Sequence, residues 1–446
     1  MTIKAAALER GADVDDHPST FAQELLFPKM TSNPDQNRAH NIENIHVVRG
    51  LLDVAALSHA IDHIIARHES LRTVFTVSPR GLRLRVLPAK SGSLIVRDHL
   101  ASGSADPSEI DVAVRADAEH LFDLTSERPS LFTLHKTSEL EYILVIVVHH
   151  LVVDGWSMGI LLNELATAYA AARTGHDSTY SRKPAQMSTF ARNQRELAAS
   201  PEVAPYVDYW VAQLAGLQEG PTVPYDNLED PERTFLGDRL DFELPGTLVQ
   251  NLREIARLER VTIAAVALLG FQLLLRDHSG QDDISIGVPF ANRTTPEVED
   301  CVGFLINIHC VRVRLPARTP TRDLLHKSSR SLTGALRHQE VPLIVVYEDL
   351  VSRFGAASLP NRFYRTMYIC HTHQVGPLHL QGTVCLRKPF SQQTSKTDIT
   401  LNVWPDDSSI RCQIEYNTAL YDSVTIDHLA ECYRETMARI VDDLVW

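Results

Sequence analysis

The residues best suited to chemistry lie in the segment His149-His150-Leu151-Val152-Val153-Asp154-Gly155. An imidazole exchanges its proton near neutral pH, and a backbone amide at the start of a helix can donate to a developing negative oxygen. These are the two requirements of acyl transfer, in which an amine or an alcohol attacks an activated carbonyl. Taken alone, an isolated histidine is more often a core or turn residue, so the neighbouring elements matter.

The flanking residues predict that this segment joins a strand to a helix. Residues 142–148 are continuously apolar and mostly β-branched, which is typical of a strand buried on both faces. Residues 156–173 have a helical pattern, and Gly175 provides a stop signal. The histidines are therefore expected at the carboxyl end of a buried strand, beside the positive end of a helix.

Composition excludes several other classes of function. The 446 residues are 44% hydrophobic and 22% charged, with a formal net charge of −13, so nucleic-acid binding has no electrostatic basis. The longest apolar stretch, residues 263–275, is short of the roughly 20 residues of a membrane span, and no signal peptide is evident. The six cysteines contain no Cys-x-x-Cys pair. We therefore expect a cytoplasmic protein that binds neither membrane nor metal, and we also predict that it is a monomer.

The pattern along the chain predicts a mixed α/β protein with sheet in both halves. A helix is expected at residues 57–68 and a strand at 72–77, and the loop-rich residues 176–187 are the best linker, so we place a domain boundary near residue 180. In the second half we expect strands at 283–289, 303–315, 365–371, 398–403 and 411–416, and helices at 247–258, 262–277, 321–339 and 425–441.

The segment His149-His150-x-x-x-Asp154-Gly155 resembles the His-His-x-x-x-Asp-Gly signature of the condensation domains of nonribosomal peptide synthetases, a branch of the chloramphenicol acetyltransferase-like superfamily. Residues 67–75, Arg-His-Glu-Ser-Leu-Arg-Thr-Val-Phe, are similar to a second family motif. Further similar segments follow in the family's order: Thr20-Phe-Ala-Gln23, Asn292-Arg293, Gly303-Phe-Leu-Ile-Asn307, His338-Gln-Glu-Val-Pro342, Thr397–Leu401 and Glu415–Thr418. The resemblance covers residues 19–445.

The resemblance implies a fold and a substrate. After a flexible lead-in of residues 1–17, two acetyltransferase-like lobes, 18–180 and 181–446, would form a V-shaped pseudo-dimer with an active-site tunnel between them. Phosphopantetheine arms of carrier proteins would bring donor and acceptor into this tunnel, so that the reaction becomes effectively intramolecular. The enzyme itself would bind no cofactor.

The resemblance also assigns roles within the motif. His150 would be the catalytic residue, either removing a proton from the attacking group or orienting it and stabilising the tetrahedral intermediate. We expect His149 to orient the loop, because neighbouring groups commonly fix the orientation of a reactive histidine. Asp154 would pair with Arg293 from the other lobe and so be structural.

Three residues keep less specific roles at this stage. The amide of Gly155 is a candidate oxyanion donor, although a glycine needed only for the turn explains it equally well. Trp156 and Asn307 are candidates for the substrate tunnel, and such an asparagine more often holds loop backbone.

We therefore expect a free-standing condensation enzyme of antibiotic or related natural-product biosynthesis. It would transfer an acyl or aminoacyl group from a carrier protein, supplied in trans, to a free or carrier-bound amine or alcohol. Two alternatives stay open: an acyl-CoA-dependent acyltransferase of the same fold, and a non-catalytic domain that recruits other enzymes to a carrier. The recruitment reading is disfavoured because such domains lose the second histidine or the glycine, and both are present here.

Overall fold

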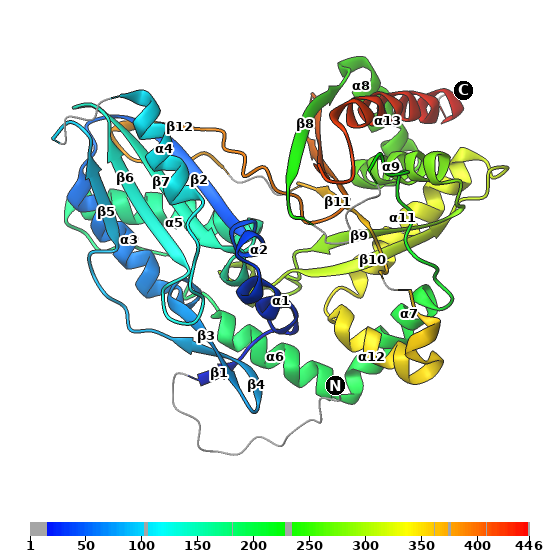
Figure 1. The fold of residues 1–446 in the computed structure, drawn as a ribbon, viewed down its shortest axis with the longest axis horizontal. Coiled ribbons are helices and arrows are strands. Elements are labelled where there is room, and N and C mark those ends of the chain that lie inside the picture. Colours follow the sequence, from blue (N-terminus) through cyan, green and yellow to red (C-terminus); the bar gives the residue numbers. More distant parts are fainter. Residues whose placement is uncertain are drawn as a thin grey trace. The chain divides into compact units, whose positions relative to one another are not determined.

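The computed structural model describes residues 16–101, 106–180, 182–227, 234–360, 362–372, 376–406 and 408–444 (Figure 1). The chain divides into two compact units. The first contains residues 1–200, 291–306 and 374–392, and the second contains residues 201–290, 307–373 and 393–446. Both units are mixed α/β, as predicted.

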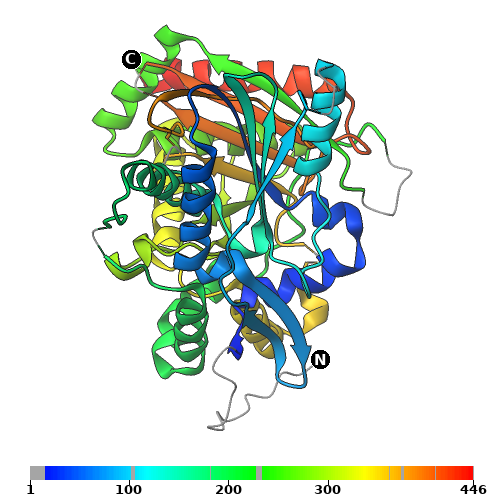
Figure 2. The same cartoon turned by 90° about the vertical axis from the view of Figure 1, so that its left-hand side faces the viewer.

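The strands of the first unit form two sheets within its described residues. A five-stranded sheet has the order β12-β2-β7-β6-β5, in which only β5 and β6 are parallel, and a three-stranded antiparallel sheet has the order β1-β4-β3 (Figure 2). The elements are β1 (Asp16–Pro18), α1 (Phe21–Ser32), α2 (Pro34–Arg38), β2 (Asn41–Gly50), α3 (Val54–Arg67), η1 (Glu69–Arg72), β3 (Thr73–Ser78), β4 (Gly81–Val86), β5 (Leu94–Asp98), α4 (Pro107–Ala118), β6 (Ser130–Lys136), β7 (Glu141–His149), η2 (His150–Val152), α5 (Gly155–Thr174), α6 (Met187–Ala199), α10 (Pro296–Glu299) and β12 (Thr383–Arg387).

The central strand β7 explains where the histidine pair lies. Successive side chains of a strand point to opposite faces of the sheet, and every residue of β7 from Tyr142 to His149 is buried. Both faces of β7 are therefore covered, as the apolar run predicted. Helix α5 follows within a few residues and ends at Gly175, which is left-handed with φ 69°.

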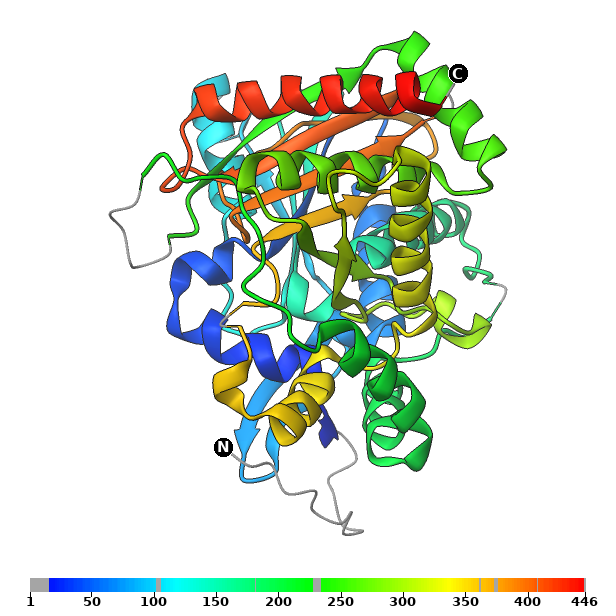
Figure 3. The same ribbon diagram turned by 90° about the vertical axis from the view of Figure 1, so that its right-hand side faces the viewer.

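The second unit is built on one six-stranded sheet of order β10-β9-β11-β13-β14-β8, in which β11 runs parallel to both of its neighbours. Figure 3 shows the long helix α13 lying beside α9 over this sheet. The elements are η3 (Pro201–Val203), α7 (Ala204–Leu214), β8 (Gly237–Leu244), α8 (Gly246–Leu258), α9 (Ile263–Ser279), β9 (Asp283–Phe290), β10 (Asn307–Arg314), α11 (Thr321–Arg337), α12 (Leu343–Phe354), η4 (Ala356–Ser358), β11 (Thr366–Cys370), β13 (Ile399–Pro405), β14 (Ile410–Asn417) and α13 (Ser423–Leu444).

Each unit has its own hydrophobic core, and no single described helix meets the length and hydropathy expected of a membrane span. The helices α8 and α9 meet that criterion only as a pair, bent by 111°.

The structure corrects the predicted domain limits at three places. The predicted end of the flexible lead-in at residue 17 was wrong, because residues 16–18 form β1 and pair with β4. Residues 1–15 of the predicted lead-in lie outside the described residues. The boundary near residue 180 falls instead at residue 200, because α6 packs on the first unit and buries Met187 in its core. Residues 291–306 and 374–392 also belong to the first unit, where β12 pairs with β2.

Candidate active site

His149 is built into the turn that follows β7. Its side chain is fully buried, and its Nδ1 accepts a hydrogen bond from the amide of Leu151 at 3.2 Å. Its ring meets that of Phe122 edge to face, with centroids 6.1 Å apart. A histidine held in this way shapes the backbone on which the next residue sits.

The hydrogen bond at one nitrogen of His150 determines which nitrogen is basic. Its Nδ1 lies 2.8 Å from the carbonyl oxygen of Val153, and its backbone amide donates to the carbonyl of His40 at 2.7 Å. Because a carbonyl oxygen can only accept, Nδ1 carries the hydrogen, and in the neutral ring Nε2 is the basic nitrogen. The half-buried ring also meets the ring of Phe304 edge to face at 5.1 Å.

The start of α5 places Asp154 and Gly155 in different environments. Asp154 is the N-cap, and its carboxylate accepts from the amide and the hydroxyl of Ser157 at 2.9 and 2.7 Å. Gly155 is the first helical residue and is exposed, and a Cβ added to it would meet nothing within 4 Å. The helical backbone at Gly155 can be adopted by any residue. The need for a turn therefore does not explain why a glycine is present at this position. Its amide lies in the first turn, where α-helical amides have no partner in the helix.

Asp154 and Arg293 form the predicted ion pair. Two guanidinium nitrogens of Arg293 lie 2.9 and 3.0 Å from the two carboxylate oxygens of Asp154, and both side chains are 1% exposed. The amide of Leu305 also donates to this carboxylate at 3.3 Å. Asp154 is thus committed to Arg293 and to the helix start, and it is not the partner of His150 in an acid–base pair.

The prediction that Arg293 comes from the other lobe was wrong. Residues 291–306 leave the second unit at the end of β9 and return to it at the start of β10, but their contacts assign them to the first unit. The hydroxyl of Ser157 lies 3.1 Å from both the amide and the carbonyl oxygen of Gly303, and Arg293 donates to the hydroxyl of Ser157 and to the carbonyl of Cys301. These hydrogen bonds attach residues 291–306 to the start of α5 and place Phe304 against the ring of His150.

Trp156 contributes to the same fastening. Its indole N–H donates to the carbonyl of Glu299 at 3.1 Å, and the guanidinium of Arg293 lies 5.5 Å from the centre of its ring. Its contact with the substrate tunnel stays a prediction.

Asn307 lies in the second unit, whereas the other candidate residues belong to the first. Its amide donates to the backbone carbonyls of Gln339 and Glu340 at 2.7 and 3.2 Å. These bonds hold the backbone of a loop, which is one of the two roles considered for Asn307; its place in the substrate tunnel stays a prediction. His309, two residues further along β10, also contacts the carbonyl of Gln339, at 3.1 Å.

Two motifs found in the sequence hold η2 and α5, the two elements that follow the histidine pair. Gln23 is fully buried and donates to the carbonyl of Leu151 at 2.7 Å, so the Thr20–Gln23 motif holds η2. Arg67 and His68 both contact the carboxylate of Glu164 on α5, at 3.0 and 2.7 Å. The first two residues of the motif at 67–75 therefore anchor α5.

Sequence reasoning missed Phe304, Ser157 and His40 as members of the site. Phe304 lay inside a recognised motif and could have been named. Ser157 follows the N-cap by three residues, a spacing at which a hydroxyl reaches the capping carboxylate. His40 contributes its backbone oxygen, for which residue type carries no signal, and its ring also lies near that of His150, with centroids 6.4 Å apart.

Comparison with known proteins assigns the chain to a family. The family model described as Condensation domain matches residues 15–444. The chain is 31% identical over 91% of its length to chondramide synthase cmdD of Chondromyces crocatus and 30% identical over 96% to malpinin synthetase of Mortierella alpina, of which it spans only 10% and 6%. It is also 29% identical over 95% of its length to the isonitrile lipopeptide synthase of Mycobacterium tuberculosis, of which it spans 17%.

Several solved structures have a similar fold. The X-domain from teicoplanin biosynthesis matches with a TM-score of 0.84 at 21% identity, covering 98% of each chain. A mutant starter condensation domain of rhizomide synthetase RzmA, in complex with C8-CoA and Leu-SNAC, matches with a TM-score of 0.79 at 18% identity, covering 97% of this chain and 98% of that one. The fold is therefore the chloramphenicol acetyltransferase-like mixed α/β fold of condensation domains. The chain belongs to the condensation domain family, whose members occur in nonribosomal peptide synthetases and work with carrier proteins.

Proposed function

We propose that this chain transfers an acyl or aminoacyl group from the phosphopantetheine thioester of a carrier protein to an amine or an alcohol. The product is an amide or an ester of a natural product such as a peptide antibiotic. The observation that carries the proposal is the bond from His150 Nδ1 to the Val153 carbonyl, because it puts the ring hydrogen on Nδ1 and makes Nε2 the basic nitrogen, beside a helix start where Asp154 is paired with Arg293.

In the proposed step the nitrogen or oxygen of the acceptor attacks the thioester carbonyl. His150 Nε2 accepts its proton, or holds the attacking atom by a hydrogen bond, and the amide of Gly155 donates to the oxyanion of the tetrahedral intermediate. The C–N or C–O bond forms, the C–S bond breaks, and the carrier leaves as the free thiol after taking up the proton. An α-amine has a pKa of about 7.7–8.0 and is partly uncharged at neutral pH, so it needs a base less than an alcohol does.

In this proposal the substrates arrive on carrier proteins that are separate chains, and the protein itself binds no cofactor. The tether raises the local concentration of the thioester, so positioning contributes much of the rate. We assign the reaction to the cytoplasm.

The proposal is tested by loading a carrier protein with candidate acyl groups and following amine and alcohol acceptors by mass spectrometry. We expect His150→Ala to lower turnover of an alcohol by about 10²- to 10⁴-fold, the usual contribution of a general base, and turnover of an amine by less. His176→Ala is the matched control, because His176 is exposed in the loop that follows α5. Full turnover by His150→Ala would remove His150 from the mechanism.

The same assay separates the two alternatives. An acyl-CoA-dependent acyltransferase would use the free CoA thioester as well as the carrier-bound one. A recruitment domain would give no product with any donor while still binding the loaded carrier.

A further inference from the structure

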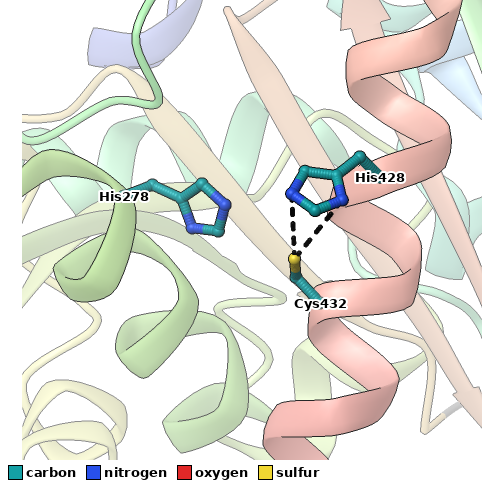
Figure 4. Close-up of side chains that lie close together, drawn as sticks. All are labelled: His278, His428 and Cys432. Carbon is teal, nitrogen blue, oxygen red and sulfur yellow. Dashed lines mark hydrogen bonds between the residues drawn. The ribbon is translucent and has the colours of Figure 1, made fainter.

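A cluster of metal-ligating side chains lies in the second unit, apart from the histidine loop. It consists of His278, in the last turn of α9, with His428 and Cys432 on α13. One ligand atom from each residue lies within 4.8 Å of the other two. Figure 4 shows His278 reaching from α9 toward the two side chains of α13.

The spacing of the two residues on α13 suits metal binding. Residues four apart lie on one face of a helix, one turn above the other. The thiol sulfur of Cys432 is 3.4 Å from Nε2 of His428. Tetrahedral bonds of about 2.0 Å to nitrogen and 2.3 Å to sulfur require ligand atoms about 3.3 to 3.6 Å apart, so this pair already has the separation that a shared metal ion needs.

His278 is oriented as a metal-ligating histidine usually is. Its Nδ1 lies 2.8 Å from the backbone carbonyl of Leu274, so Nδ1 carries the hydrogen. Donation from one ring nitrogen to a carbonyl fixes the tautomer and leaves Nε2 with the lone pair that a metal takes.

The cluster borders an open hollow in the surface of the second unit. The hollow has a volume of about 270 Å³ and is lined by Leu274, Asp277, His278, Cys432, Glu435, Thr436 and Arg439, of which Arg439 pairs with Asp277 at 2.8 Å. The hollow leaves room for a water molecule as a fourth ligand.

We propose that His278, His428 and Cys432 bind a thiophilic divalent cation, with Zn²⁺ as the best match to two imidazoles and one thiolate. The bound ion would join the end of α9 to α13. The site is independent of the proposed condensation reaction.

The proposal is tested on the full chain without a polyhistidine tag, reduced and treated with a chelator. Zn²⁺ binding is measured by equilibrium dialysis, and Co²⁺ is used as a spectroscopic probe of the ligands. We expect one equivalent of metal and a thiolate-to-cobalt charge-transfer band. Outer-shell changes weaken metal sites about 10- to 100-fold, so we expect the loss of a direct ligand in Cys432→Ser or His278→Ala to weaken Zn²⁺ binding by about 100-fold or more.

Cys385→Ser is the matched control, because Cys385 is also half-buried but lies on β12 in the first unit. The control should keep both the affinity and the charge-transfer band. Affinity that is the same in wild type, Cys432→Ser and His278→Ala would overturn the proposal, as would the absence of saturable binding. Because His428 is exposed, His428→Ala tests the site without disturbing the core, and it should lose binding with an unchanged circular dichroism spectrum. Condensation activity should be the same in Cys432→Ser and wild type, so failure of one proposal is distinguishable from failure of the other.

Discussion

Replacing Asp154 tests how far the start of α5 depends on a buried charge. Asp154→Asn keeps a good N-cap but removes the negative charge from a site where the carboxylate and Arg293 are each 1% exposed. An uncompensated buried charge costs about 3–5 kcal/mol. Asp154→Ala also loses the bond to the amide of Ser157, which adds about 1 kcal/mol. We therefore expect losses of about 3–5 and 4–6 kcal/mol in the free energy of unfolding.

Asp53→Ala is the matched control, because Asp53 caps α3 through the amide of Ala56 at 2.9 Å while exposed to solvent. It should cost only about 1 kcal/mol. Urea unfolding followed by circular dichroism measures all three variants. With a slope of about 2–3 kcal/mol per molar urea, the midpoint of the Asn variant should lie about 1–2.5 M below that of wild type. If Asp154→Asn costs no more than Asp53→Ala, the ion pair does not have the role assigned to it.

Three further outcomes follow from the site and its support. Gly155→Ala should fold like wild type, because its Cβ meets nothing within 4 Å, whereas Gly303→Ala should unfold at lower urea, because its Cβ would lie 2.5 Å from Leu305; equal midpoints would contradict this. Gln23→Ala leaves the Leu151 carbonyl without its donor and should cost about 1–3 kcal/mol together with a lower kcat; an unchanged kcat and midpoint would refute it. Burial lowers the pKa of His309 from 6.5 to about 4, so as pH falls from 6.5 to 4 the unfolded chain takes up a proton that the folded chain does not, and stability should fall by up to about 3 kcal/mol. His309→Gln should flatten this pH dependence, and a slope equal to that of wild type would assign the loss to other groups.

Features set by nearby residues were predictable from the sequence. The strand from residue 142, the loop and the helix ending at Gly175 all follow from local patterns, because burial on both faces and a left-handed cap have direct residue signatures. The pairing of Asp154 with Arg293 came from a family resemblance, since 139 residues separate the two and no local pattern links them.

Features that depend on distant contacts were not predictable. Residues 16–18 become a strand only because β4 offers an edge, and β12 belongs to the first unit only because β2 pairs with it. We expected no zinc site because no Cys-x-x-Cys pair is present; the metal site now proposed includes a His428-x-x-x-Cys432 spacing that could have been recognised on a helix. The third residue, His278, comes from another helix and has no sequence signal of its own.

Residues 291–306 belong to the first unit although the residues on both sides of them belong to the second. This limits where two homologous chains can be joined to make a chimera. A crossover anywhere between Asp154 and Arg293 would combine Asp154 of one parent with residues 291–306, including Arg293, of the other. Cutting at residue 200 would be worse, because the fragment would lack both the arginine and the strand β12. Chimeras that exchange residues 16–200 should therefore carry residues 291–306 and 374–392 from the same parent.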